Sequence, residues 1–205
     1  MFRKVLLCSL ALAFGIGSAA AQGVTVKSKR PVSDGWFPNE QLVVIERSGY
    51  IYSERRGKTS EGYDYWISPQ AAQIETGRQT WGASCKIDAM DDKTYCTLIL
   101  IDKMKASIAL SDMGEPSALC LYFSDFTPAS GMVRIDKLVA EQTDRQGCMP
   151  LQAAGAIATG KSILIHTDQM GPDYQFEHQL SLDGYKQASH LVSHLRANMG
   201  SLSFD

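Results

Sequence analysis

The stretch that decides the fold reads Trp81-Gly-Ala-Ser-Cys85-Lys-Ile-Asp-Ala-Met-Asp91-Asp92-Lys-Thr-Tyr-Cys96. Trp81 is an aromatic anchor, and the polar Met-Asp-Asp-Lys segment between the two cysteines is typical of a turn. Runs of β-forming residues on both sides of a turn predict a β-hairpin, closed by a disulfide between Cys85 and Cys96. The stretch is a structural signature, because nothing marks Asp91 and Asp92, at the turn tip, as a catalytic pair.

The first residues have the features of a secretory signal peptide. Two basic residues precede the almost unbroken apolar run Val5–Ile16, and Ala19 and Ala21 stand in the A-x-A arrangement that signal peptidase cleaves. We therefore expect residues 1–21 to be removed and the mature chain to begin at Gln22. The apolar run is shorter than the about 20 residues that span a bilayer. We expect no transmembrane segment, and a periplasmic or secreted location.

Four cysteines remain once the segment that carries Cys8 is removed: Cys85, Cys96, Cys120 and Cys148. An even number in an exported chain predicts two disulfides, since the periplasm and the cell exterior are oxidising. Three pairings are possible, and the favoured one joins Cys85 to Cys96 and Cys120 to Cys148. Zinc is the alternative, but the chain has no C-x-x-C pair. A free nucleophilic cysteine would break the even pairing.

Short β-forming runs separated by glycine, proline and aspartate clusters recur along the chain. They are Gln41–Glu46, Tyr50–Tyr52, Tyr63–Ile67, Thr97–Ile101, Ala106–Ser111, Ala118–Phe123, Met132–Val139 and Ser162–Thr167. Residues 174–182 alternate apolar and polar side chains with a period of two, which predicts a strand with one buried face. His178 falls on its apolar side, where a packed histidine is commoner than a ligand. This spacing predicts a mainly β fold, an antiparallel β-sandwich-like or barrel domain.

Two helical segments are expected. Ser68 to Gly77 predicts one helical turn, with Ser68 as N-cap and Pro69 as the first helical residue. The second is a C-terminal amphipathic helix between Gly184 and Gly200 that docks on the sheet. Its apolar stripe consists of Tyr185, Ala188, Leu191, Val192, Leu195 and Met199.

His190 and His194 stand four residues apart on this helix, a spacing that can hold one metal ion. At about 100° per residue, however, both fall opposite the apolar stripe. Leu191 also occupies the position where a zinc protease has its glutamate. We therefore expect both histidines to face water and predict no metal site.

Residues 22–79 are expected to form an N-terminal arm and aromatic-rich strands, an extension of the domain whose body spans residues 80–205. The part from Gln22 to Asn39 is polar and is expected to be loose, pinned by its aromatic residues. The strands are dense in aromatic side chains: Tyr50, Tyr52, Tyr63, Tyr65 and Trp66. They form a candidate surface for a sugar or a peptide. The structural alternative is a hairpin stabilised by cross-strand aromatic pairs.

Gly155-Ala-Ile-Ala-Thr-Gly-Lys-Ser162 matches the phosphate-loop pattern G-x-x-x-x-G-K-S. The pattern binds phosphate only where a buried strand enters the loop and a helix leaves it. Here the loop runs into the β-branched segment Ile163–Ile165, which predicts a turn into a strand, with Lys161 in solvent. We predict no bound nucleotide and no cofactor. No serine stands in a G-x-S-x-G elbow, and we find no catalytic residues.

The charge balance bears on the class of partner. The chain has 20 basic and 22 acidic residues, a formal net charge of −2, and removal of the leader takes away two basic residues and no acidic one. A net negative charge disfavours nucleic acid and anionic membrane surfaces as partners.

From Thr80 to Leu195 the chain resembles the invasion-associated locus B family of exported bacterial proteins. The resembling features are the leader, Trp81-x-x-x-Cys85 followed by Cys96, and two late segments, Ala158–Thr167 and Gln179–Ala188. The resemblance implies a periplasmic or secreted β-rich domain, linked by name to host-cell invasion, with no catalytic residues to carry over. The chain departs from the family in its longer aromatic N-terminal part and in the wide separation of its two later cysteines.

We therefore expect an exported, non-enzymatic binding or interaction protein of a Gram-negative bacterium, linked to host-cell invasion or envelope stress. A cell-envelope hydrolase, with its acid and base scattered along the strands, is the alternative. A third possibility is a stress or adhesion accessory that needs a partner protein.

Overall fold

The structure is a computed structural model that describes residues 24–69, 71–77, 79–102, 104–111, 113–123, 125–151, 154–167, 176–198 and 200–205. The expected leader, residues 1–21, lies outside the described residues. The strands are β1 (Val24–Pro31), β2 (Gln41–Arg47), β3 (Tyr50–Lys58), β4 (Asp64–Ile67), β5 (Ala72–Thr76), β6 (Gln79–Ile87), β7 (Thr94–Ile101), β8 (Lys105–Leu110), β9 (Pro116–Tyr122), β10 (Met132–Ile135), β11 (Glu141–Gln142), β12 (Cys148–Pro150), β13 (Ser162–Thr167) and β14 (Phe176–Ser181). The helices are α1 (Ala154–Thr159) and α2 (Tyr185–Ala197). None of the described helices is long and apolar enough to cross a membrane.

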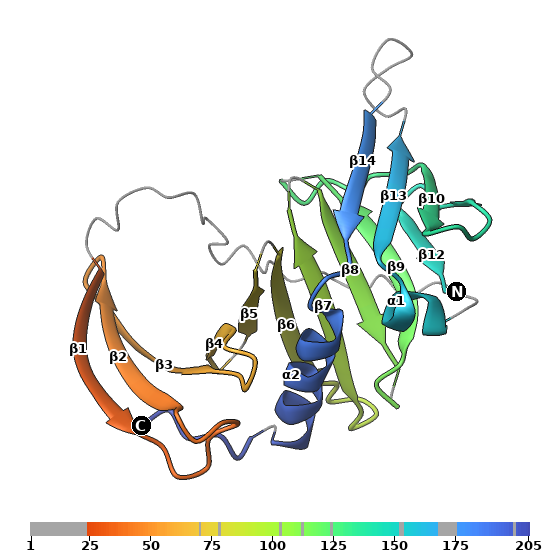
Figure 1. Cartoon of the computed structure of the whole chain (residues 1–205). Helices are drawn as coiled ribbons and strands as arrows, with labels where there is room; N and C mark the ends of the chain where they lie inside the picture. The colour runs from red at the N-terminus through yellow and green to blue at the C-terminus, as the bar shows by residue number, and fades with distance from the viewer. Residues whose placement is uncertain are drawn as a thin grey trace.

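The protein is mainly β, as predicted, and is built from two antiparallel sheets. The larger sheet has ten strands in the order β1 to β9 followed by β12, so its first nine strands pair in chain order. The smaller sheet has the order β11–β10–β13–β14. Figure 1 shows β1–β3 curving away from the body, while β13 and β14 lie over β7–β9 and α2 lies beside β6.

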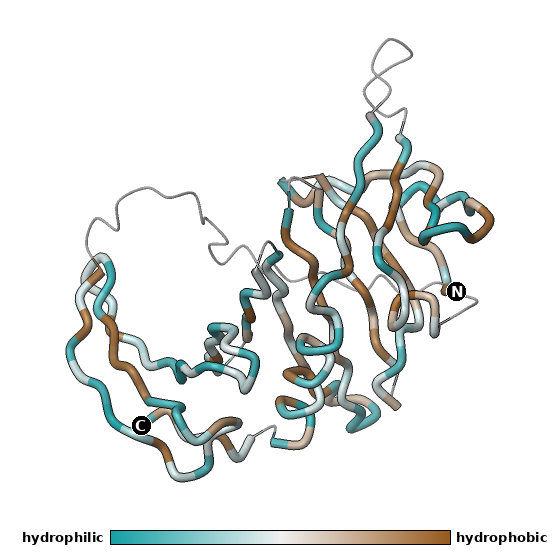
Figure 2. Tube along the Cα trace, in the orientation of Figure 1, coloured by the Kyte–Doolittle hydropathy of each residue, from teal (hydrophilic) through white to brown (hydrophobic). Residues whose placement is uncertain are grey.

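One hydrophobic core joins the two sheets and α2. Its members come mostly from β4–β9, from β10, β13 and β14, and from α2, with one residue each from β12 and α1. Figure 2 shows hydrophobic stretches along β2 and β13. In β13 buried and partly exposed residues alternate, because successive side chains of a strand point to opposite faces. The body is therefore a sandwich, with α2 packed on β5, β6 and β7.

The predicted hairpin is β6–β7, and it is centred on Trp81. Cys85 lies opposite Cys96 in the register, and Trp81 lies opposite Leu100. The Trp81 side chain is fully buried, donates from Nε1 to the carbonyl oxygen of Asp183 at 2.8 Å, and meets Tyr185 edge-on. The hairpin thus holds the start of α2 as well as its own two strands.

Both predicted disulfides are present. Cys85–Cys96 closes the β6–β7 hairpin with a Cα–Cα distance of 4.1 Å. Cys120–Cys148 joins β9 to β12 with a Cα–Cα distance of 4.0 Å. Each links two directly opposed residues of neighbouring strands, so the later pair is close in space although 28 residues separate it in the chain.

The C-terminal helix is also confirmed, since the buried residues of α2 are those of the predicted stripe: Tyr185, Ala188, Leu191, Val192 and Leu195. Met199 lies outside the described residues. Gly184 is the N-cap with φ of 80°, a left-handed conformation that favours glycine. A Cβ atom at Gly184 would lie 2.0 Å from Thr76 Oγ1, so glycine also permits the close approach of β5.

Three local predictions are wrong. The described residues of Ser68 to Gly77 hold no helical turn: Ser68 closes a tight turn with Ala71, and β5 follows, paired with β4 and β6. Sheet pairing on both sides here outweighs the local helical signal. The arm from Gln22 to Asn39 is not loose over its described part, because β1 pairs with β2 along its length. The strand expected over Met132–Val139 ends at Ile135, where Asp136 turns with φ of 48°.

Gly184 and Gly200 provide a matched test of how α2 is seated. We expect Gly184→Ala to lower the free energy of unfolding by about 3 kcal/mol, from the clash with Thr76 added to backbone strain. Gly200→Ala has the same φ of 80° and nothing within 4 Å of the new Cβ, so it should cost only about 1 kcal/mol. Urea denaturation measures both values. Equal losses would mean that the approach of Thr76 does not constrain Gly184.

Candidate functional site

The five aromatic residues proposed as one surface do not form one. Tyr50 and Tyr52 are 78% and 39% exposed, whereas Tyr65 is only 3% exposed. Tyr63 and Trp66 are half-buried. A residue as buried as Tyr65 cannot belong to an exposed binding surface, so that part of the prediction is corrected.

Tyr65 is buried by a segment distant in the sequence. Its ring meets Trp36 edge-on at a centroid distance of 4.9 Å and Phe37 at 5.9 Å. In the sheet it lies opposite Gly57 and Ile74 rather than another aromatic residue. The cross-strand aromatic pairs offered as the structural alternative are therefore wrong for Tyr65, which is covered by the loop between β1 and β2.

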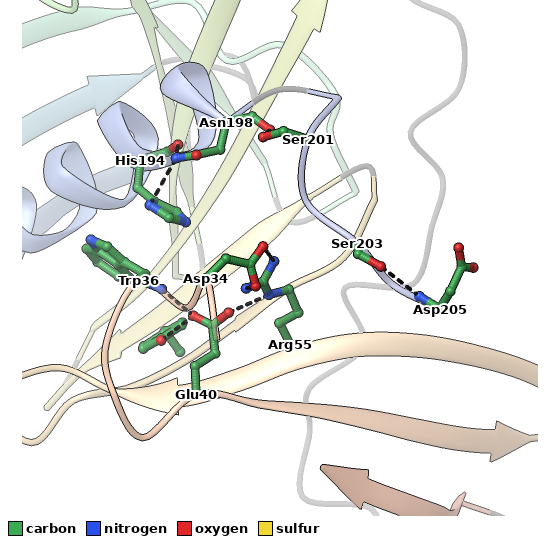
Figure 3. A network of polar contacts seen from close by, with 10 residues as sticks. Asp34, Trp36, Glu40, Arg55, His194, Asn198, Ser201, Ser203 and Asp205 are labelled. Carbon is green, nitrogen blue, oxygen red and sulfur yellow. Dashed lines mark hydrogen bonds and ion pairs between the residues drawn. The ribbon is translucent and has the colours of Figure 1, made fainter. Parts of the chain in front are cut away.

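A buried polar cluster lies beneath this loop, and Figure 3 shows it facing the end of α2. Arg55 is fully buried, and its Nε donates to Glu40, which is 1% exposed. The guanidinium also forms a fork with Asp34, donating at 2.8 Å and 3.3 Å to the two carboxylate oxygens. The other oxygen of Glu40 accepts hydrogen bonds from the Trp36 backbone N–H at 2.9 Å and the Tyr65 hydroxyl at 2.5 Å.

The cluster satisfies its buried charges internally. The Arg55 guanidinium forms ion pairs with two carboxylates, those of Glu40 and Asp34. The side chain of Asp34 is half-exposed and lies at the solvent side of the cluster. The hydrogen bond from Arg55 lowers the pKa of Asp34. Burial, aided by the hydrogen bond to Glu40, raises the pKa of the Tyr65 hydroxyl far above its usual value. Tyr65 therefore stays a neutral donor, and the cluster holds β3 and the loop in one arrangement.

His194 completes the junction from the side of α2. Its ring stacks on Trp36 at a centroid distance of 5.8 Å, and its Nδ1 lies 3.3 Å from the Asn198 side-chain nitrogen. Its Nε2 is buried without a hydrogen-bond partner among the described residues. Burial lowers the pKa of His194, against the opposing charges of Glu40 and Asp34.

The expectation that both helix histidines face water is thus wrong for His194. His190 is exposed, but Trp36 covers the helix face on which His194 lies. Across the part of the chain that the structure describes, no group of three or more His, Cys, Asp and Glu side chains is placed to hold a metal ion.

The phosphate-loop pattern has the reverse of the required context. Helix α1 comes before Gly160 and strand β13 after it, and Lys161 is exposed, as predicted. The backbone N–H groups of Lys161 and Ser162 donate to the Asp136 carboxylate at about 3 Å. These hydrogen bonds lower the pKa of Asp136. An internal carboxylate thus occupies the backbone donors that a phosphate would need, at the edge of an open hollow of about 990 Å³.

A His–Asp pair is present elsewhere in the described part of the chain. His178 Nε2 lies 3.5 Å from Asp102 Oδ2, with both side chains partly buried. Neither residue lines the open hollow beside Asp136 or the smaller hollow beside Cys85. Asp136 is the only carboxylate among the described residues that line these two hollows. The arrangement that would favour the hydrolase alternative is therefore not found there.

Five exposed apolar side chains lie at one end of β1–β3, which we call the N-terminal tip: Val24, Val26, Tyr50, Ile51 and Tyr52, which are 38–78% exposed. The other exposed large apolar residues among those described are spread over several turns and strands of the body. The register brings four of the five tip residues to one face, because Val24 and Tyr50 flank Arg47 while Val26 and Tyr52 flank Ile45. Ile51 lies opposite Glu46 and points to the other face of the same strand ends. Paired residues of neighbouring strands point to the same face, about 5 Å apart per strand. Figure 1 shows these strand ends far from the smaller sheet.

The tip is the candidate functional site. Tyr50 and Tyr52 were predicted for it, whereas Val24, Val26 and Ile51 were missed. The alternation Val-Thr-Val at the start of β1 was a usable signal for a strand with an apolar face. The buried cluster positions this unit, because Arg55 lies opposite Leu42 in the β2–β3 pairing and is tied to the loop below α2.

The buried cluster makes a prediction about stability. Arg55→Met leaves the Glu40 carboxylate buried without its cation, which should lower the free energy of unfolding by about 3–5 kcal/mol. Lys58→Met, also on β3, removes an exposed ion pair with Asp64 and should cost less than about 1 kcal/mol. Chemical denaturation of both variants checks this. A loss at Arg55 no larger than that at Lys58 would show that the cluster does not anchor the unit.

The His194 environment makes a prediction about pH. Because the folded state lowers its pKa below the usual value of 6.5, the unfolded chain binds the proton more readily. Stability should therefore fall as the pH drops through 6.5 toward the lowered pKa, by less than about 1.4 kcal/mol per pH unit for one proton. We expect His194→Gln to flatten this part of the stability–pH curve, and the exposed control His190→Gln to leave it unchanged. Thermal melts of both variants from pH 5 to 8 measure these stability–pH curves. Identical curves for the two variants would contradict the assignment of the pH dependence to His194.

Comparison with known proteins does not assign the chain to a family. No protein-family model, no curated protein and no solved structure matches the chain. The resemblance to the invasion-associated locus B family therefore stays a prediction from the residues quoted for it. The function has to be argued from the described residues themselves.

Proposed function

We propose that the protein is an exported, non-enzymatic binding protein that uses its N-terminal tip to engage a partner protein. The observation that carries the proposal is the exposure of five large apolar side chains on one end of a three-stranded unit. Isolated exposed apolar residues are ordinary, whereas several gathered at one place are typical of interaction sites. The buried cluster around Arg55 supports the proposal, because it presents the tip on a rigid base.

Strand β1 supplies a second means of recognition. It is the edge of the ten-stranded sheet, with β2 on its inner side, and all eight of its residues are exposed. An exposed edge can accept an extended segment of another protein through backbone hydrogen bonds. Lys27, which forms an ion pair with Glu46, and Lys29 lie on this edge, and lysines on an edge strand oppose uncontrolled pairing between copies. The features together favour a partner that adds a strand with acidic side chains.

The compartment is argued from the cysteines. Two disulfides, and no membrane-spanning helix in the described part, are consistent with a periplasmic or secreted protein. The leader expected at residues 1–21 supports export. By resemblance to the invasion-associated locus B family, the partner would belong to the bacterial envelope or to a host cell that the bacterium invades.

Site-specific photo-crosslinking in the source cells tests the proposal. We expect a photo-reactive phenylalanine analogue at Tyr50 or Tyr52, which share one face of β3, to give one adduct with a single partner. The same analogue at Tyr95 or Ile87 should not give it. These control residues are 47% and 48% exposed and lie on the outer part of the β6–β7 hairpin. The same adduct at all four positions, or none at the tip, would reject the tip as the binding site.

Affinity measurements with the partner so identified provide the quantitative check. Tyr50→Ser combined with Val26→Thr, two changes on one face of the tip, should weaken binding by about tenfold or more, as expected for an apolar anchor. The matched control, Tyr95→Ser combined with Ile87→Thr, should change it by less than about twofold. Equal effects of the two pairs would show that general surface apolarity, rather than the tip, governs binding.

A further inference from the structure

The two disulfides share one local architecture but have different surroundings. Each joins directly opposed residues of adjacent antiparallel strands, with Cα–Cα distances of 4.1 Å and 4.0 Å. Because the backbone setting is the same, a difference in reactivity has to come from nearby charges and from access. Cys120–Cys148 is therefore an internal reference for Cys85–Cys96.

A cation lies against one sulfur of the hairpin disulfide. Arg196, in the last turn of α2, donates from Nε to Cys96 Sγ at 3.4 Å and from an outer nitrogen to the Ser111 carbonyl oxygen at 2.9 Å. The second contact holds the guanidinium in place. A neighbouring guanidinium stabilises a thiolate relative to a thiol, so Cys96 is set up to carry negative charge when the disulfide opens.

The other cysteine of this disulfide, Cys85, is the one that an external thiol can reach. Cys96 is only 2% exposed, whereas Cys85 is partly exposed and lines a hollow of about 200 Å³. The end of α2 and the C-terminal tail, through Leu195, Leu202 and Phe204, form the other walls. This volume is below the about 300–1,000 Å³ typical of cofactor sites. It suits a single entering side chain, such as a cysteine of another protein.

The reference disulfide has a charge of opposite sign beside it. The backbone N–H of Cys148 donates to the Asp144 carboxylate at 2.8 Å, which places negative charge beside that disulfide. A nearby carboxylate disfavours formation of a thiolate. Both Cys120 and Cys148 are partly exposed, but neither lines the hollow beside Cys85 or the hollow beside Asp136. The neighbouring charge is therefore the main difference between the two disulfides.

We infer that Cys85–Cys96 is a redox-active disulfide that exchanges with an external protein dithiol, while Cys120–Cys148 is structural. A thiolate of the dithiol attacks Cys85 sulfur, the Cys85–Cys96 bond breaks, and Cys96 leaves as a thiolate beside Arg196. The second thiol of the partner, deprotonated, then attacks the mixed disulfide and releases Cys85. The partner is oxidised to its disulfide, the hairpin is reduced by two electrons, and the two protons of the dithiol are released or pass to the two cysteines.

Reduction of the full oxidised protein with dithiothreitol at pH 7 tests the assignment. Aliquots are alkylated over time, and peptide mass mapping gives the reduced fraction of each disulfide separately. We expect Cys85–Cys96 to be reduced about tenfold faster than Cys120–Cys148, because exchange is faster when the leaving thiol is more acidic. Equal rates, or reduction of both only at the rate of global unfolding, would overturn the inference.

Arg196→Met separates the electrostatic role of this residue from a structural one. Loss of the cation should slow reduction of Cys85–Cys96 about tenfold and leave Cys120–Cys148 unchanged. Simple loosening of α2 would have the opposite effect, because it would open the hollow and accelerate reduction. An unchanged or increased rate at Cys85–Cys96 therefore contradicts the inference, and Arg196→Lys should keep most of the wild-type rate.

A second measurement does not depend on disulfide exchange. In Cys85→Ser, Cys96 is a free thiol beside Arg196 and should show thiolate absorbance near 240 nm at pH 7. Adding Arg196→Met should abolish this absorbance, while a circular dichroism spectrum confirms that both variants are folded. Absence of the thiolate band in folded Cys85→Ser, or its persistence without Arg196, would rule out stabilisation by the guanidinium.

Discussion

The rest of the structure depends on how Trp81 holds the start of α2. Its indole N–H donates to the carbonyl oxygen of Asp183, a residue 102 positions later, and its ring packs edge-on against Tyr185. A buried indole N–H left without an acceptor is costly, so this bond fixes where the helix begins. From that point the helix carries His194 to the N-terminal loop and Arg196 to the hairpin disulfide. One buried contact thus sets the position of two separate chemical environments.

The buried charges around Arg55 act on the arrangement of parts more than on overall stability. Taking a guanidinium and a carboxylate out of water costs several kcal/mol per ion, which their attraction repays only with good geometry and further hydrogen bonds. Here Trp36, Tyr65 and Asp34 supply those bonds. An alternative packing of the loop would leave Glu40 or Arg55 unpaired. The cluster therefore selects one orientation of β1–β3 relative to α2.

Much of the body could be predicted from the sequence, because its signals are local. The turn between Cys85 and Cys96, the period of two before Ser181 and the stripe of α2 each reflect the geometry of a single element. Two errors, at His194 and Tyr65, lie where a distant segment covers a residue. His194 lies opposite the apolar stripe, yet Trp36 from another unit buries it. For the same reason the sequence pattern places Tyr65 on the surface, whereas Trp36 and Phe37 cover it.

The candidate site divides in the same way. Exposure of Tyr50 and Tyr52 follows from their place beside a turn, whereas the contribution of Val24 and Val26 depends on β1 pairing with β2. The short sequence of β1 does not by itself determine which strand it pairs with. Arg196 contacts Cys96 although the two residues are 100 positions apart in the sequence. No spacing pattern in the sequence predicts this contact.

The order of the large sheet has a consequence for folding during synthesis. Since β1 to β9 pair in chain order, each strand can add to the previous one as the chain emerges N-terminus first. The growing sheet, however, keeps an uncovered face until the last segment arrives, because β13, β14 and α2 come from the final 44 residues of the 205-residue chain. A nascent form of this protein therefore has an extended, half-finished apolar surface for most of its synthesis. Such a chain needs shielding until α2 closes over Trp81.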